Sequence, residues 1–186
     1  MEDAMNYMEI KEFDIADGPG VRVSLFVSGC PHRCPGCFNE CAWDHRAGKA
    51  FTGAVEDRII RSCNRDSVSG LTLLGGEPFD PANQPAVFPF LRRWRAEVPG
   101  KTIWAYTGYV YEDLLEGGRA HMEFTDGILS MTDVLVDGPF VMRLKSIALM
   151  FRGSSNQRVI DLRKTERAGH VVQWGGLRDR SPSVAG

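Results

Sequence analysis

Long hydrophobic runs are absent from this 186-residue chain. Its longest apolar stretches, at 23–27, 133–138 and 147–151, fall far short of the roughly 20 residues that a membrane-spanning helix requires. Residues 1–14 are polar and acidic, which is not the composition of a secretory signal. The sequence therefore predicts a cytoplasmic protein that has no membrane partner.

The chain also lacks a strong charge of either sign. It has 22 lysines and arginines against 24 aspartates and glutamates, so its formal net charge is −2. The basic residues are scattered, whereas nucleic-acid-binding proteins gather theirs into a patch or stripe. We therefore expect no nucleic-acid partner. The length predicts one domain, over residues 1–174, and the apolar-poor segment 175–186 is predicted to be a disordered tail.

Cysteine is scarce but concentrated. The chain has five cysteines, an odd number that argues against a closed disulfide framework. Four of them, Cys30, Cys34, Cys37 and Cys41, fall within "CPHRCPGCFNEC". The fifth, Cys63, lies in a helical pattern and is expected to be a core thiol. Because thiols stay reduced in the cytosol, the four clustered cysteines indicate metal binding or redox chemistry.

Apolar runs that end in glycine-bearing loops alternate with helical patterns. Strands are predicted at 21–29, 69–78, 101–109 and 131–140, and two weaker ones at 157–162 and 170–174. Helices are predicted at 54–64, 81–98 and 110–117. This alternation is typical of a parallel sheet built from β–α units. Since a closed (β/α)8 barrel takes about 250 residues, we predict an α/β fold with a partial TIM-like barrel of parallel strands.

Binding sites in such sheets form at the carboxyl ends of the strands. Three chemically distinctive segments follow predicted strands: the cysteine loop, "GGEP" (75–78) and "DGPF" (137–140). The sequence therefore predicts that these three segments meet at one edge of the sheet.

Three ligand sets are open for the cysteine loop. They are Cys30, Cys34 and Cys37; the same three with Cys41; and zinc bound by some of these with His32 or His45. Structural zinc favours two well-separated Cys-x2-Cys pairs, and here there is one cluster and no second pair. Iron–sulfur clusters accept several thiolates from one tight loop. The spacing thus favours an iron–sulfur cluster, and it leaves the histidines as loop residues.

The Cys-x3-Cys-x2-Cys spacing directly after a strand resembles the signature of radical S-adenosylmethionine (SAM) enzymes. These enzymes hold a 4Fe–4S cluster by three cysteines, and their Gly-Gly-Glu-Pro segment resembles residues 75–78. The segment "DGPGVR" (17–22) resembles the glycyl-radical-enzyme activases. Segments 134–140 and 152–161 resemble the branch that activates anaerobic ribonucleoside-triphosphate reductase, and the similarity runs from about residue 6 to residue 163.

The resemblance implies a role for each matching residue. Cys30, Cys34 and Cys37 would be the catalytic cluster ligands and would leave one iron open for the methionine part of SAM, with Cys41 as a bystander. Contacts with SAM are implied for six residues: Gly36, Cys37, Phe38, Gly75, Gly76 and Glu77. The family usually has an aromatic residue just before the third cysteine. This chain has Gly36 there and Phe38 after the cysteine, which suits the activase branch.

Other residues and segments near the strand ends each allow two interpretations. Segment 106–109 either touches SAM or forms an ordinary turn, and Asp137 with Gly138 either faces a partner peptide or ends a strand. Asn39 either organises the cysteine loop or touches substrate. The polar residues of the next segment either contact a partner or form a solvated turn; they are Arg152, Asn156 and Arg158.

The implied activity is reductive cleavage of SAM to a 5′-deoxyadenosyl radical. This radical would take a hydrogen atom from a glycine of anaerobic ribonucleoside-triphosphate reductase, and a flavodoxin-like or other low-potential donor would supply the electron. One alternative is a small-molecule radical SAM enzyme, such as a 7-carboxy-7-deazaguanine-synthase-like cyclase, but "DGPGVR" and "RGSSNQR" (152–158) favour the activase. A non-enzymatic iron–sulfur or zinc module is the other alternative, and it would not need "GGEP".

Overall fold

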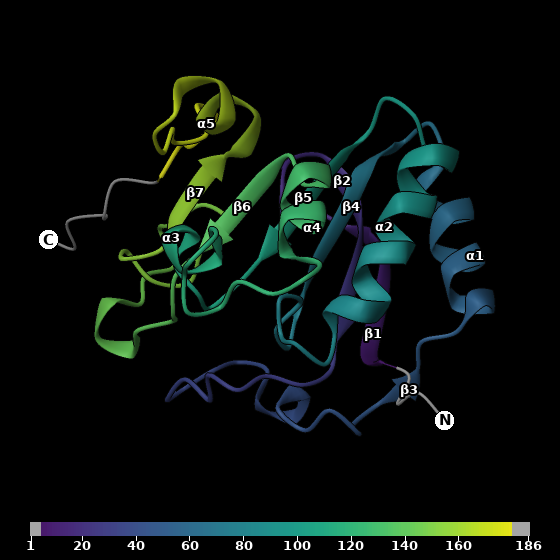
Figure 1. Cartoon of the computed structure of the whole chain (residues 1–186), viewed down its shortest axis with the longest axis horizontal. Coiled ribbons are helices and arrows are strands. Elements are labelled where there is room, and N and C mark those ends of the chain that lie inside the picture. The colour runs from purple at the N-terminus through teal and green to yellow at the C-terminus, as the bar shows by residue number, and fades with distance from the viewer. Residues whose placement is uncertain (1–4, 180–186) are drawn as a thin grey trace, which may run out of the picture.

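The computed structural model describes residues 5–179, which form one seven-stranded sheet with helices packed on one face (Figure 1). The strands are β1 (Asn6–Asp14), β2 (Val21–Val27), β3 (Lys49–Ala50), β4 (Val68–Gly75), β5 (Thr102–Tyr106), β6 (Val134–Asp137) and β7 (Arg158–Asp161). The α-helices are α1 (Gly53–Cys63), α2 (Gln84–Glu97), α3 (Tyr111–Leu114), α4 (Thr125–Met131) and α5 (Leu162–Ala168). Two short 3-10 helices are η1 (Glu40–Ala42) and η2 (Met142–Leu144). None of the helices in residues 5–179 is long and apolar enough to cross a membrane.

The strand order across the sheet is β3-β1-β2-β4-β5-β6-β7. The four central strands β2, β4, β5 and β6 are parallel, whereas β1, β3 and β7 run antiparallel to their neighbours. The predicted α/β class is confirmed, and the prediction of parallel strands is wrong at both edges. The short turn between β1 and β2 explains one edge, because parallel neighbours need a long crossover. The partial barrel is not tested by the strand order and stays a prediction.

The central elements match the sequence patterns best. Predicted helices 54–64 and 81–98 correspond to α1 and α2, and four predicted strands correspond to β2, β4, β5 and β6. Strand β1 and helices α4 and α5 were not predicted. In β1, half-buried positions alternate with the exposed residues Glu9, Lys11 and Phe13, and charged residues stand on both faces, so the strand has no clear apolar pattern. The strand predicted at 170–174 is reduced to an isolated bridge between Ile160 and Gln173.

Side chains of the central strands alternate between two cores, because successive residues of a strand point to opposite faces. Ile103 and Leu135 face the main core beneath the helices. Trp104, next in sequence, faces a smaller core on the other side of the sheet. There its ring lies 5.3 Å from that of Phe151 and 5.0 Å from that of Trp174, both edge to face. The second face of the sheet is therefore covered by chain that follows β6, not by long helices.

Part of the predicted tail packs against this second core. Leu177 contacts it, and Asp179 accepts hydrogen bonds from the backbone of Met150 and the guanidinium of Arg152. Residues 180–186 lie outside the described residues, so the predicted limit of the domain stays a prediction.

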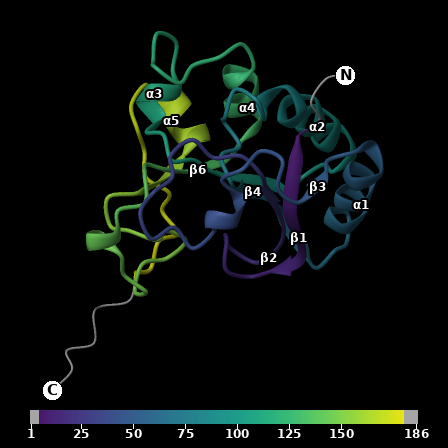
Figure 2. The ribbon, with the colours of Figure 1, turned by 90° about the horizontal axis from the view of Figure 1, so that it is seen from below.

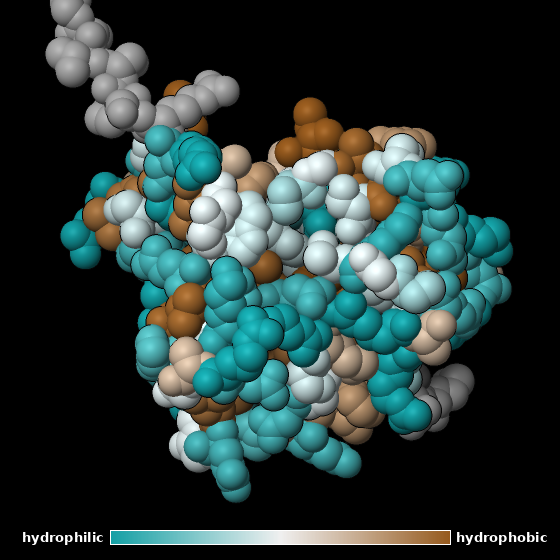
Figure 3. Space-filling model, turned by 90° about the horizontal axis from the view of Figure 1, so that it is seen from above, coloured by the Kyte–Doolittle hydropathy of each residue, from teal (hydrophilic) through white to brown (hydrophobic). Residues whose placement is uncertain are grey.

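The long segment between β2 and β3 lies at the carboxyl ends of the parallel strands, the end seen in Figure 2. Hydrophilic side chains cover most of the opposite end of the molecule, which is seen in Figure 3. The cysteine loop and the other chemically distinctive segments thus gather at one end of the sheet, as parallel β–α topology predicts.

Candidate functional site

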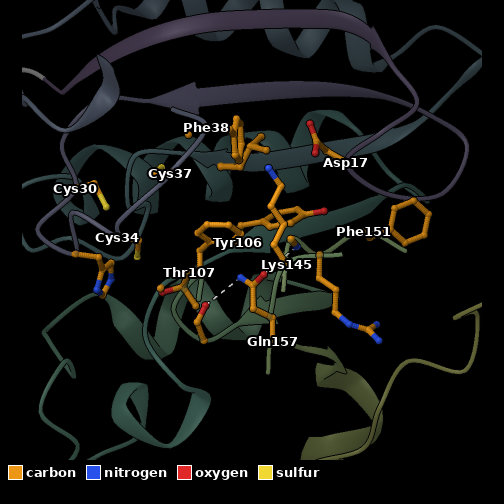
Figure 4. A pocket seen from close by; sticks show the side chains of 18 of the residues that line it. Asp17, Cys30, Cys34, Cys37, Phe38, Tyr106, Thr107, Lys145, Phe151 and Gln157 are labelled. Atoms are coloured by element: carbon orange, nitrogen blue, oxygen red, sulfur yellow. Dashed lines mark hydrogen bonds between the residues drawn. The ribbon is translucent and has the colours of Figure 1, made fainter. Parts of the chain in front are cut away.

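A cavity of about 420 Å³ lies on the face of the sheet that the helices leave uncovered. Its walls come from the cysteine loop (30–38), the turn after β4 (75–77), the end of β5 (106–108) and the loop between β6 and β7. Figure 4 shows the three cysteines at one end of the cavity, Asp17 and Phe151 at the other, and Tyr106 between them. The predicted site segments therefore meet around one space.

The four thiols of the loop after β2 form two groups that differ in their burial. Cys30, Cys34 and Cys37 are free, partly buried and line the cavity. Cys41 is exposed, and its Sγ donates a hydrogen bond to Asn39 Oδ1 at 3.3 Å. The backbone N–H of Asn39 points at Cys37 Sγ at 3.4 Å, and whether its side chain organises this loop stays a prediction. Of the four cysteines, the three of the Cys-x3-Cys-x2-Cys pattern are those that share the cavity.

Burial makes two of these thiols hard to ionise in the absence of a cation. It raises the pKa of Cys30 to about 11, although the backbone N–H groups of His32 and Arg33 oppose the rise. Burial also raises the pKa of Cys34. Metal coordination deprotonates a thiol outright, so a bound cation would reverse this preference. Burial therefore favours the neutral form of Cys30 and Cys34, and a bound metal would favour their thiolates.

The donor set fits an iron–sulfur cluster in its chemistry. Within residues 5–179, no three His, Cys, Asp or Glu side chains converge closely enough to coordinate a single metal ion. Thiolates that hold a 4Fe–4S cluster bind different irons, so they need not converge on one point. Gly36, at φ +73°, turns the backbone between the second and third thiols. Phe38 also lines the cavity, and it is 85% exposed.

Two glycines bring the turn after β4 against the start of the cysteine loop. Gly75 has φ +104°, and a Cβ there would lie 2.7 Å from the Cα of Phe26. A Cβ on Gly76 would lie 2.4 Å from the carbonyl oxygen of Gly29. The backbone N–H of Gly76 donates to Val27, and the next N–H along the chain donates to Gly29, both at 2.7 Å. These glycines thus permit a backbone contact that no larger residue allows.

Glu77 lies fully buried at the edge of the cavity. Its Oε1 accepts a hydrogen bond from the backbone of Phe79 at 2.9 Å. Its Oε2 accepts from the backbone of Gly108 and lies 2.8 Å from His32 Nε2. The carboxylate therefore joins the cysteine loop to the ends of β4 and β5. The predicted contact between Glu77 and the ammonium of SAM stays a prediction.

Comparison with known proteins agrees with this donor set. Residues 16–160 match the family of 4Fe-4S single cluster domains. The anaerobic ribonucleoside-triphosphate reductase-activating protein of Escherichia coli (strain K12) is 46% identical over 161 residues, which cover 86% of this chain and 100% of the relative. The protein of that name from Vibrio cholerae is 40% identical over 155 residues, 82% of this chain and 96% of the relative. The chain belongs to this family of reductase-activating proteins. A further member, from Enterobacteria phage T4, is 37% identical over 155 residues, 83% of this chain and 93% of the relative.

The polar residues after β6 hold the cavity wall together. Asp137 is buried and accepts hydrogen bonds from the backbone of Tyr111 and from the guanidinium of Arg158. Arg158 also pairs with Glu112 and lowers the pKa of that carboxyl. Asn156 donates to the carbonyl of Pro139 at 2.8 Å. These contacts give the segment a structural role, and contact with a partner stays a prediction.

The sequence patterns gave no role to Asp17, although it opens the "DGPGVR" segment. It lines the far end of the cavity from the cysteines (Figure 4). Burial raises its pKa to about 7, and the neighbouring carboxyl of Asp14 adds to the rise. Lys145 lines the same cavity, from a loop without a periodic pattern. Neither residue could be found from spacing alone, because its position depends on tertiary packing.

The substitution Asp17→Asn is expected to stabilise the protein more at pH 8 than at pH 5. The folded state holds a proton on Asp17 up to about pH 7, whereas an unfolded aspartate gives it up near 3.8. Wild-type stability therefore falls as pH rises through this window, and asparagine has no charge to bury. We expect a gain on the order of 1 kcal/mol at pH 8, since solvent screens part of the charge. Urea unfolding at both pH values measures it. The exposed Asp66→Asn is the control, and a gain independent of pH would contradict the assignment.

Proposed function

We propose that this chain is a radical SAM activating enzyme that generates a glycyl radical on anaerobic ribonucleoside-triphosphate reductase. Cys30, Cys34 and Cys37 would hold a 4Fe–4S cluster, and the turn 75–77 would receive the methionine end of SAM. The observation that carries this proposal is the shared cavity: three thiols line it beside that turn, while Cys41 faces solvent. The names of the relatives support the identity of the partner.

The chemistry divides between the cofactors and the chain. A reduced 4Fe–4S cluster, when bound, supplies one electron that breaks the C5′–S bond of SAM into methionine and a 5′-deoxyadenosyl radical, which takes a hydrogen atom from a glycine α-carbon of the reductase. The chain itself would bind and orient the cluster and SAM, and it would exclude water from the cavity. Its three thiolates leave one iron without a protein ligand, and the apolar walls at Leu74, Tyr106 and Phe140 shield the reacting atoms from water.

Three further features belong to this proposal. The open sheet would be a partial TIM-like barrel of radical SAM type, and the cavity lies on the face of the sheet that the helices do not cover. A flavodoxin-like or other low-potential donor would reduce the cluster. The protein would work in the cytoplasm, where its free cysteines stay reduced.

The test is anaerobic reconstitution with iron and sulfide, followed by SAM, a reductant and the anaerobic reductase. We expect about four irons per chain and a glycyl doublet in the electron paramagnetic resonance (EPR) spectrum that requires both SAM and the reductase. A reductase whose radical-bearing glycine is replaced by alanine is the control. Cleavage of SAM with no doublet would favour a small-molecule radical SAM enzyme, and protein that binds no iron would overturn the proposal.

A further inference from the structure

The side chain of His32 leaves the cysteine loop and enters the protein between two cluster-ligand candidates, Cys30 and Cys34. It is only 15% exposed, and its Nε2 lies 2.8 Å from Glu77 Oε2. At this distance the ring and the carboxyl group share a hydrogen bond, and the tautomer of the ring decides which of them donates. The loop is therefore tied to the end of β4 at a point between two of its thiols.

The same imidazole also packs against the end of β5. Its ring centroid lies 4.4 Å from that of Tyr109, edge to face. The backbone N–H of Gly108 donates to the same carboxylate oxygen that His32 contacts, at 2.8 Å. A Cβ on Gly108 would lie 2.4 Å from Cδ2 of the ring, so the two residues are in close contact. Three chain segments, from β2, β4 and β5, thus converge on one side chain.

A second histidine of the loop makes a looser contact with the same turn. His45 Nε2 lies 3.1 Å from Asp80 Oδ1, and this side chain is 46% exposed. It does not line the cavity; it lies eight residues beyond Cys37, and its ring contacts Gly29. The chain therefore offers a matched pair of histidine–carboxylate contacts, one buried between the ligand candidates and one near solvent.

We propose that His32 is a positioning residue: it fixes the Cys30–Cys34 segment against the ends of β4 and β5, and so sets where the open iron of the cluster lies relative to the turn 75–77. This inference rests on the proposed function, since it concerns the cluster and SAM. The thiols would still bind iron without the imidazole, but the segment that carries two of them would lose its fixed place on the sheet. Substitution of a residue that orients a metal ligand from outside the coordination sphere typically lowers metal affinity or activity about 10–100-fold.

The experiment compares His32→Ala, His32→Gln and His45→Gln after anaerobic reconstitution. Iron content and the EPR spectrum of the reduced cluster are measured during a SAM titration, without any reductase present. His32→Ala is expected to retain iron and to need about tenfold more SAM for the half-maximal spectral change. His32→Gln keeps an N–H donor that reaches Glu77 and is expected to recover most of the wild-type response. His45→Gln is expected to match wild type.

The outcomes separate the inference from the proposed function. A His32→Ala protein with the wild-type spectrum and SAM dependence would overturn the positioning role, as would an equal loss in His45→Gln. Wild-type protein that binds no iron or ignores SAM would instead overturn the proposed function. If circular dichroism shows that His32→Ala does not fold, His32→Asn takes its place, because this polar side chain is too short to reach Glu77. A wild-type response from His32→Asn would likewise overturn the role.

Discussion

Replacing Cys30, Cys34 or Cys37 singly by alanine is expected to lower the iron content of reconstituted protein to background and to abolish activation of the reductase. Under the proposed function each thiolate would bind a different iron, so two remaining ligands would leave half of a 4Fe–4S cluster without a protein anchor. The loss in activity should therefore exceed the roughly 100-fold that changes outside the coordination sphere produce. Iron and sulfide assays and the glycyl EPR doublet measure the two effects.

Cys41→Ala is the matched control, because Cys41 belongs to the same loop but is exposed and bonded to Asn39. It should keep wild-type iron content and activity. If Cys41→Ala lost iron as the other three variants do, the cluster would have four protein ligands. No iron would then be open for SAM, and the radical mechanism would fail with the ligand assignment.

That Cys30, Cys34 and Cys37 share one cavity could be predicted from the sequence, because it depends on spacing within one short loop; their role as cluster ligands stays a prediction. The meeting of this loop with residues 75–77 could also be predicted, since neighbouring parallel strands end at the same edge of a sheet. The role of His32 could not. Spacing places it between two cysteines, but whether its ring faces solvent or the sheet depends on Glu77 and Gly108, which lie far away in sequence.

The fold likewise has elements that local sequence patterns predict and elements that depend on contacts between distant residues. Helix α1 and strand β4 carry clear local patterns and were predicted within a few residues. The cavity wall between β6 and β7 has no such local pattern. Contacts between residues distant in sequence hold this wall in place, such as the hydrogen bond from Arg158 to Asp137. Strand β1 was missed because charged residues stand on both of its faces, and only its antiparallel pairing with β2 shows it to be part of the sheet. Local periodicity predicts elements, whereas tertiary contacts decide edges and loops.

Gly76→Ala is expected to destabilise the protein and to remove its response to SAM. The new Cβ would lie 2.4 Å from the carbonyl oxygen of Gly29, a backbone atom that cannot rotate away as a flexible side chain can. Two backbone hydrogen bonds cross this contact, from Gly76 to Val27 and from Glu77 to Gly29. Relieving the clash must separate the turn from the loop that carries the cluster ligands. Overpacking of this kind typically costs about 1–3 kcal/mol.

Gly53→Ala is the control, since nothing lies within 4 Å of a Cβ at this position at the start of α1. Alanine there is expected to leave the free energy of unfolding unchanged or to raise it by about 0.5–1 kcal/mol. Urea unfolding and an anaerobic SAM titration followed by EPR measure both variants. If Gly76→Ala and Gly53→Ala had the same free energy of unfolding and the same response to SAM, the turn after β4 would tolerate displacement. Because Glu77 of that turn contacts His32 of the cysteine loop, close contact between the two segments would then no longer explain how the cavity is held together.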